Sequence, residues 1–163
     1  GMFEHVGRSH LPEYFRRAWD LLRPGGLFLN HGIAAHVTAR LRKGVASGPS
    51  FTQAHIFPDG ELEPLAETLS AAESVGFEVR DVENLREHYA RTLRLWLHNF
   101  EKHKDRAIAL VGEGKYRVWR LFLASSAQGF AAGRTEVSQS LLARPGVSGA
   151  VLLPLTRADL YRT

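Results

Sequence analysis

Apolar residues recur at helical spacing near the start of the chain. Six of them form one stripe at i, i+3, i+4, i+7, i+8 and i+11: Leu11, Tyr14, Phe15, Ala18, Trp19 and Leu22. This spacing predicts a helix, and Ser9 can cap its first turn. The Arg-Pro-Gly-Gly sequence at residues 23–26 ends the helix, because proline and glycine do not continue it. The apolar run at residues 27–33 then predicts a strand that is buried on both faces.

The middle of the chain contains two further elements. Residues 36–60 show no period and contain three glycines and two prolines, which predicts a long loop or lid. A helix is predicted over residues 61–75, where one side is apolar: Leu62, Leu65, Leu69 and Ala72. Gly76 ends this helix, and alternation over residues 77–82 predicts a second strand.

Two longer helices are expected next. The first has an apolar stripe at Tyr89, Leu93, Trp96, Leu97, Phe100, Ile108 and Val111. The second has one at Tyr116, Trp119, Phe122, Leu123, Ser126 and Phe130. Between them, Gly-Glu-Gly at residues 112–114 predicts a helix–helix turn and not a nucleotide-binding loop, because Arg117 stands where a third glycine would fall. Residues 136–143 predict a third strand, and a tail with proline and glycine follows it.

Helices that alternate with strands predict an α/β fold. The 163 residues suit a single domain. Four parts are expected: a helix and strand with a catalytic loop (1–35), the lid loop (36–60), the remaining helices and strands (61–143) and the tail (144–163). Three strands are few for such a sheet, which usually has about five or six.

Charge favours an anionic partner. The formal net charge is +4, and 17 of the 21 basic residues are arginine. A phospholipid surface or nucleic acid would attract such a chain, although a solvated Arg-rich surface without a partner has the same composition. The basic residues are scattered along the sequence, whereas a nucleic-acid-binding patch clusters them. We therefore expect no nucleic-acid partner.

Several kinds of site and segment are not indicated by the sequence. The chain has no cysteine, which excludes disulfides and thiolate metal sites within it. Its eight histidines show no His-x-x-x-His spacing, so we predict no metal site. No apolar run approaches the ~18 residues of a membrane span, and no signal peptide is visible. This pattern predicts a cytoplasmic protein.

Three polar residues stand where the predicted sheet would hold a ligand. In open α/β sheets, ligands lie beyond the carboxyl ends of the strands. His31 lies at the end of the first predicted strand, Tyr89 follows the second, and Glu4 lies in the loop before the first helix. Together they could hold a small anion or a proton acceptor. Each also has an ordinary structural interpretation, as a helix-entry acid, a core histidine and a core aromatic ring.

A set of motifs, in order along residues 1–143, resembles one enzyme family. The chain is similar to the cyclopropane-fatty-acyl-phospholipid synthases and mycolic acid cyclopropane synthases. The matching segments are Gly-Met-Phe-Glu-His-Val-Gly (1–7), Tyr-Phe (14–15), Leu-Arg-Pro-Gly-Gly (22–26), Asn-His-Gly-Ile (30–33), Ile-Phe-Pro-Asp-Gly-Glu-Leu (56–62) and His-Tyr-Ala-Arg-Thr-Leu (88–93). Phe-Glu-His-Val-Gly and Phe-Pro-x-Gly in this order are specific, whereas Pro-Gly-Gly occurs in most methyltransferases.

The resemblance implies a fold and a reaction. The fold is the C-terminal part of a Rossmann-like class I methyltransferase sheet with a helical insertion. The reaction is methyl transfer from S-adenosylmethionine to the cis double bond of phospholipid acyl chains, by a protein peripheral to the inner membrane. A bound bicarbonate takes a proton as the ring closes, and its ligands match Glu4, His31, Tyr89 and the backbone of Ile33.

Departures from the family pattern bear on the substrate. Ser126 stands where many members have cysteine, and Gly32 replaces the threonine of a His-Thr-Ile segment. The lid reads Glu-Leu-Glu-Pro at residues 61–64, where many members read x-Leu-Pro. These changes indicate a subgroup with another acyl substrate or a methyl-branched product.

The Gly-rich cofactor loop of the family has no counterpart in this sequence. We therefore expect a domain truncated at its N-terminus, inactive in isolation, whose cofactor-binding residues are unknown. Its first strand would then have an open edge, which is a liability. We expect homodimerisation, or a rearranged lid or tail, to cover that edge. The alternative to an enzyme is a non-catalytic dimeric remnant that acts as an interaction module.

Overall fold

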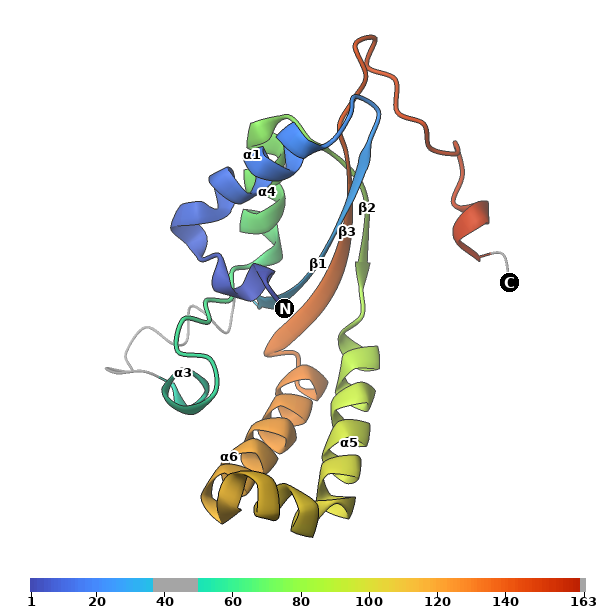
Figure 1. Ribbon diagram of the computed structural model, residues 1–163. Coiled ribbons are helices and arrows are strands. Elements are labelled where there is room, and N and C mark those ends of the chain that lie inside the picture. The colour runs from blue at the N-terminus through green and yellow to red at the C-terminus, as the bar shows by residue number, and fades with distance from the viewer. Residues whose placement is uncertain (37–49, 162–163) are drawn as a thin grey trace.

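The computed structural model describes residues 1–36 and 50–161 and has helices on a three-stranded sheet (Figure 1). The elements in chain order are η1 (Phe3–His5), η2 (Arg8–His10), α1 (Leu11–Leu21), β1 (Leu27–Ala35), α3 (Phe51–His55), α4 (Leu65–Val75), β2 (Glu78–Asn84), α5 (Arg86–Lys102), α6 (Lys104–Ala131), β3 (Thr135–Ala143) and η3 (Ala158–Tyr161). The predicted α/β fold is confirmed, and each of the three predicted strands is present.

The last strand in the sequence lies in the middle of the sheet. The strand order is β1-β3-β2, and β3 is antiparallel to both neighbours. Leu27 lies opposite Ala143, and Ala35 lies opposite Thr135. β1 and β2 therefore run parallel to each other, so their carboxyl ends lie at the same end of the sheet.

Helices α1 and α4 cover one face of the upper sheet (Figure 1). Their apolar sides meet β2 and β3 around Phe15, Phe77 and Leu142, which are buried. Burying a ring such as that of Phe15 stabilises the fold by about 1.5–3 kcal/mol. The stripe predicted for the first helix is therefore the core-facing side of α1.

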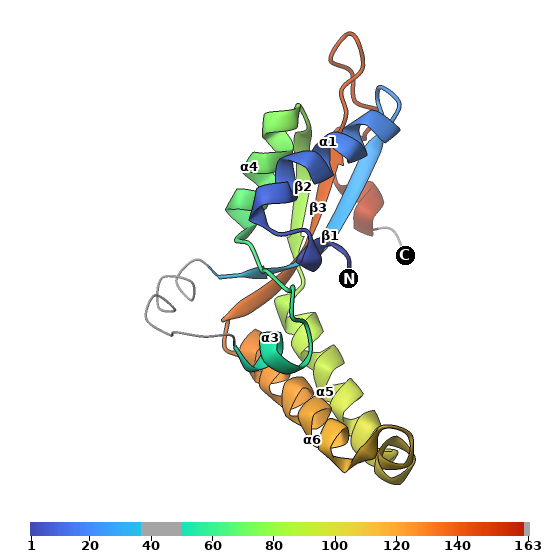
Figure 2. The same cartoon turned by 60° about the vertical axis from the view of Figure 1, so that its left-hand side comes forward.

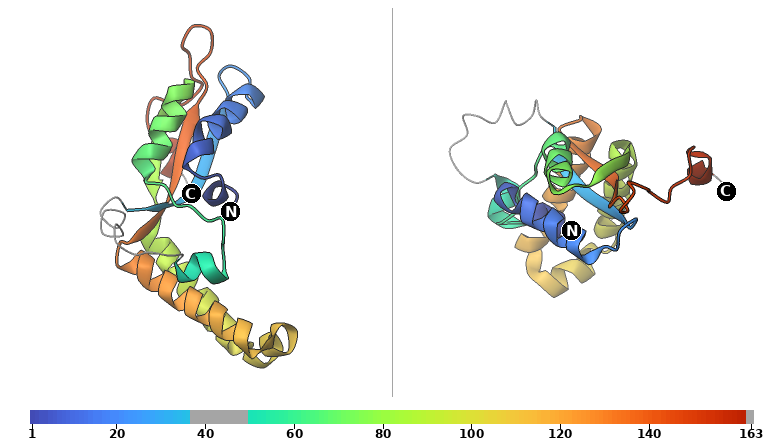
Figure 3. Two further views of the ribbon diagram at one scale, coloured as in Figure 1. Left: turned by 90° about the vertical axis from the view of Figure 1, so that its left-hand side faces the viewer. Right: turned by 90° about the horizontal axis from the view of Figure 1, so that it is seen from above.

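Helices α5 and α6 form a hairpin that extends beyond the end of the sheet (Figure 2). A second core joins the base of this hairpin to β1 and β3, with Leu93, Phe130 and Val137 buried in it. The two cores lie at different levels of the molecule, which gives it an elongated shape (Figure 3).

The expectation that the first strand is buried on both faces is wrong. Along β1 the buried residues are Asn30, Gly32 and Ala34, whereas Leu27, Leu29 and His31 are exposed. The physical reason is the period of two in a strand, which directs alternate side chains to opposite faces. Helices α1 and α4 pack against only one of those faces.

The predicted lid is partly helical where the structure describes it. Residues 37–49 of the lid lie outside the described residues. Ser50 caps α3 by a reciprocal capping box with Gln53, an arrangement that stabilises a helix start. The following helix begins at Leu65, later than predicted, because Pro64 is extended and removes an N–H donor.

The long helical pair divides at two points. His103 separates α5 from α6, a break that the sequence did not predict. Gly112 interrupts α6 with φ 81° and ψ 157°, which confirms the predicted helix–helix turn. Within the described residues no helix has the length and hydropathy to cross a membrane.

The tail contacts the sheet at the edge opposite β1. Arg157 donates a hydrogen bond to Asp81 of β2 over 2.7 Å. The expectation that the tail covers the edge of β1 is therefore wrong. Among residues 1–36 and 50–161, β3 is the only strand that pairs with β1.

Candidate active site

A hydrogen bond joins the loop before α1 to the first strand of the sheet. Oε1 of Glu4 accepts a hydrogen bond from the backbone N–H of Ile33 over 2.8 Å. The backbone carbonyl of Glu4 accepts another from the N–H of Glu61 over 2.9 Å. Glu4 therefore connects η1, β1 and the segment that precedes α4.

Close packing of Phe3 on Gly32 holds this arrangement. Phe3 is buried, and a Cβ atom added to Gly32 would lie 2.5 Å from its Cδ1 atom. Any side chain at position 32 would collide with the ring. The absence of a side chain at Gly32 therefore lets η1 approach β1 closely.

The carboxylate of Glu4 remains ionised. Burial is the largest single influence and raises the pKa, but the Ile33 N–H and the amino group of Gly1, 2.9 Å from Oε2, outweigh it. The net effect is a pKa below the usual value for glutamate. The other carboxylate oxygen, Oε2, is buried and pairs with the Gly1 amino group. Within the described residues no side chain donates a hydrogen bond to Oε2.

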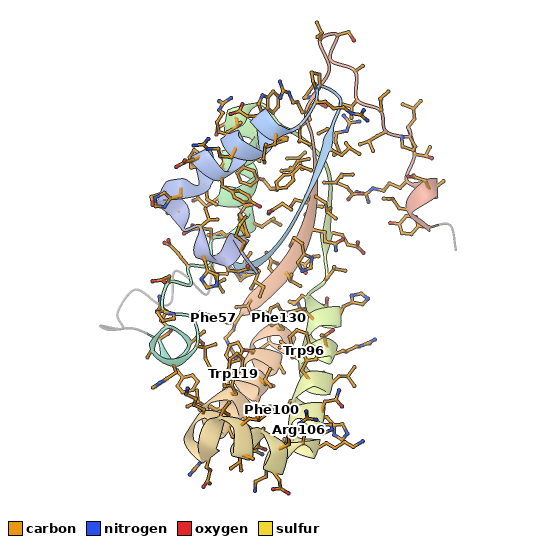
Figure 4. All side chains as sticks on the ribbon, viewed as in Figure 1. Phe57, Trp96, Phe100, Arg106, Trp119 and Phe130 are labelled. Carbon is orange, nitrogen blue, oxygen red and sulfur yellow. The ribbon has the colours of Figure 1, made fainter. Side chains whose placement is uncertain are left out.

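Tyr89 lies at the base of the hairpin on the same side as Ile33. Its ring packs against Phe130 and Trp96, with centroids 4.8 and 6.0 Å away, and Figure 4 shows those two residues on facing helices. Burial, followed by the negative charge of Glu4, raises the pKa of Tyr89. Ile33 and Tyr89 pack against the same core, so the Tyr89 ring lies near the strand whose Ile33 N–H binds Glu4.

His31 is placed less favourably than predicted. Its side chain is exposed on the face of β1 that also carries Ile33, and its Nδ1 lies 3.4 Å from the amide nitrogen of Gln139. It makes no hydrogen bond with Glu4 or Tyr89, all three being described residues. The structure thus joins Glu4 to Ile33 by a hydrogen bond and packs Ile33 and Tyr89 against one core, whereas the polar neighbour of His31 is Gln139.

A partly buried polar pair that joins α1 to β1 was not predicted. The Tyr14 hydroxyl donates a hydrogen bond to Oδ1 of Asn30 over 3.0 Å. Burial, and then the charge of Glu4, raises the pKa of Tyr14 as well. Asn30 within an otherwise apolar strand was the available signal, since buried amides need partners.

These groups can hold a small oxyanion that carries one O–H. A buried carboxylate oxygen can accept that O–H, and a protonated phenol can donate to another oxygen. No group of three metal-binding side chains occurs among the described residues. The only Gly-x-Gly of the sequence is at the hairpin turn, remote from Glu4, so it is not a cofactor loop.

A family model described as mycolic acid cyclopropane synthetase matches residues 1–140. The chain belongs to this family. The resemblance inferred from the motifs is thereby confirmed, and the family is one of S-adenosylmethionine-dependent methyltransferases.

Named relatives agree with this membership. A probable fatty acid methyltransferase of Pseudomonas putida is 44% identical over 163 residues, 99% of this chain and 41% of that protein. Cyclopropane mycolic acid synthase MmaA2 of Mycobacterium tuberculosis is 31% identical, over 88% of this chain and 53% of that protein. The chain thus spans about half the length of the curated relatives that it matches.

Solved structures in the family share the fold. The structure of MmaA2 from Mycobacterium tuberculosis superposes with a TM-score of 0.80 at 30% identity, covering 88% of this chain and 53% of that one. Mycolic acid cyclopropane synthase CmaA1, complexed with SAH and CTAB, gives the same values. The Rossmann-like methyltransferase assignment is therefore confirmed. The roles of Glu4, His31, Tyr89 and Ile33 stay predictions.

Proposed function

We propose that this chain acts in methyl transfer from S-adenosylmethionine to the cis double bond of phospholipid acyl chains, as in cyclopropane-fatty-acyl-phospholipid synthases. The observation that carries the proposal is the hydrogen bond from Ile33 N–H to the Glu4 carboxylate, beside the core that Ile33 shares with Tyr89. Membership of the family supports the reaction class.

The residues present fit a bicarbonate ion beside the Glu4 carboxylate. When bound, bicarbonate supplies a small base for the proton lost as the ring closes. Oε2 of Glu4 is buried, lies 2.9 Å from the Gly1 amino group and has no side-chain donor in the described part of the chain. Its remaining lone pair would accept the O–H of the ion. Tyr89, protonated because its pKa is raised, would donate to another oxygen of the ion.

The other two predicted residues have supporting roles in this proposal. The N–H of Ile33 is already bonded to Glu4, so Ile33 orients the carboxylate and does not itself bind the ion. His31 would add an imidazole from the same face of β1 by turning away from Gln139. The carboxylate and the surrounding aromatic rings would also stabilise positive charge that develops on the acyl chain.

S-adenosylmethionine supplies the methyl group, and its binding residues remain unassigned. The described residues contain no Gly-rich loop between a strand and a helix. We propose that the 163-residue chain by itself does not turn over. Isothermal titration with S-adenosylhomocysteine tests the basis of this proposal: micromolar binding at one site per chain would show that the chain forms a cofactor pocket. Methyl transfer by the isolated chain would contradict the proposal.

A chimera tests the reaction and the residues together. Residues 1–163 replace the matching part of the Pseudomonas putida relative, and labelled methyl transfer into vesicles of cis-unsaturated phospholipid is measured. Glu4→Gln and Tyr89→Phe should each lower the rate about 100-fold or more, because each would misplace the bicarbonate and a positioned acid–base group contributes at least that much.

Matched controls separate chemistry from folding. Glu13→Gln and Tyr161→Phe make the same changes at exposed positions and should leave the rate unchanged. Vesicles of saturated phospholipid should accept no methyl group. Transfer to saturated lipid, or a Glu4→Gln chimera as active as its parent, would refute the proposal.

A dimeric, non-catalytic interaction module is the second candidate. It is favoured by the outer edge of β1, on the side away from β3. Within the described residues no strand pairs with this edge, and β1 carries exposed Leu27 and Leu29. An inactive but folded chimera, together with a dimeric chain, would favour this candidate over the enzyme.

A further inference from the structure

The α5–α6 hairpin concentrates the positive charge of the chain. Residues 86–131 contain nine Lys and Arg against four Asp and Glu, a formal net charge of +5. The rest of the chain contains twelve basic and thirteen acidic residues, a net charge of −1. The overall charge of +4 therefore resides in this one structural unit.

The hairpin tip, defined as residues 102–117, gathers cations from both helices. Phe100 of α5 stacks on Tyr116 of α6 with ring centroids 4.9 Å apart, so residues that are far apart in the sequence meet at this level. Five basic side chains in the tip are exposed: Lys102, Lys104, Arg106, Lys115 and Arg117. Figure 4 shows Arg106 at the far end of the hairpin from Phe130.

These cations are not neutralised by the protein itself. Just outside the tip, Arg120 pairs with Glu101 over 2.6 Å. In contrast, none of the five tip cations forms an ion pair with any described residue. Only Asp105 and Glu113 offset them, so the tip has a formal charge of +3.

Exposed apolar side chains lie between the two groups of cations. Leu110 is 75% exposed and Val111 is 47% exposed, immediately before the turn at Gly112. Neither residue belongs to either core, and the hairpin tip lies at the end of the molecule opposite α1 and α4 (Figure 3). Exposed apolar residues flanked by basic ones are typical of segments that enter a membrane interface.

We propose that the hairpin tip docks on an anionic phospholipid bilayer. The five cations face the lipid phosphates, and Leu110 and Val111 enter the acyl boundary. Nucleic acid is the less favoured anion, because it would leave this apolar pair without a partner. The choice of a lipid surface rests on the proposed function, which places the substrate in a bilayer.

Vesicle flotation with the 163-residue chain tests the docking. Vesicles of phosphatidylcholine with phosphatidylglycerol are compared with pure phosphatidylcholine, at ~0.01 M and ~0.5 M salt, since salt screens such contacts. The chain should bind the anionic vesicles at low salt. Lys104→Gln/Arg106→Gln should weaken this binding about 25-fold, since each cation near the surface contributes roughly fivefold.

Two pairs of control variants give the test its specificity. Arg16→Gln/Arg23→Gln removes the same charge from exposed positions on and beside α1 and should change binding by less than about twofold. Leu110→Ser/Val111→Ser should weaken binding, whereas Val147→Ser/Leu155→Ser, at exposed apolar positions of the tail, should not. Circular dichroism of each variant verifies that it is folded.

Three results would overturn the proposal: no binding to anionic vesicles, equal losses in tip and control variants, or tighter binding to duplex DNA than to vesicles. The assay needs neither S-adenosylmethionine nor turnover. Vesicle binding can therefore fail while the chimera stays active, or persist while it is inactive, so this inference and the proposed function fail separately.

Discussion

The position of the Glu4 carboxylate depends on Gly32, a neighbouring residue without a side chain. The carboxylate reaches the N–H of Ile33 because Phe3, next to it in η1, lies against Gly32 of β1. At this scale, the absence of a side chain at Gly32 allows the close approach of Phe3, and its bearing on the substrate stays a prediction. The carboxylate, the ring and the glycine form one unit.

Gly32→Ala should destabilise the chain by about 1–3 kcal/mol, because the added methyl group overpacks a buried ring. Urea unfolding measures the loss. In a Phe3→Leu background the same substitution should cost less, since the smaller side chain leaves room at position 32. Equal costs in the two backgrounds would show that Phe3 is not the constraint.

The hairpin is the element that joins site and tip. Its base contributes Tyr89 to the site, and its far end carries the cations. Gly112 sets its shape, because φ 81° with ψ 157° is a conformation that residues with a side chain rarely adopt. The Gly-x-Gly that a motif search would assign to a nucleotide is therefore a bend in a helix.

Gly112→Ala should cost about 1–3 kcal/mol of stability through backbone strain. The matched control is Gly114→Ala, two residues away and with open space around its Cβ position. Because Gly114 lies within a helix, its replacement by alanine should stabilise the chain by about 0.5–1 kcal/mol. Chemical denaturation measures the free energy of unfolding of both variants. Gly112→Ala should lower it, and Gly114→Ala should raise it.

At the scale of the whole molecule, one edge of the sheet stays open within the described residues. β3 occupies the centre, the tail contacts β2, and β1 presents its second edge with Leu29 53% exposed. Exposed strand edges pair readily with other strands. Homodimerisation through this edge stays a prediction.

Light scattering after size exclusion should give the mass of two chains. Leu29→Lys should shift the protein toward the monomer, because a charge beside the edge opposes pairing. Leu121→Lys, at a similarly exposed position on α6, is the control and should leave the dimer intact. A monomeric parent chain would contradict the prediction.

The sequence by itself determined the elements and the family. Hydrophobic periodicity located α1, α5, the second half of α6 and all three strands, because that period is a local property of the chain. Motifs such as Phe-Glu-His-Val-Gly identified the family and singled out Glu4, His31, Tyr89 and Ile33. Glycine alone indicated the turn at residue 112.

Tertiary structure decided what those residues do for one another. Only folding shows that Ile33 N–H binds Glu4, that Gly32 makes space for Phe3, and that His31 turns to Gln139. Scattered basic residues became a single charged tip because the hairpin brings α5 and α6 together, with Phe100 stacked on Tyr116. Such contacts join distant segments, and local patterns carry no record of which distant segments will meet.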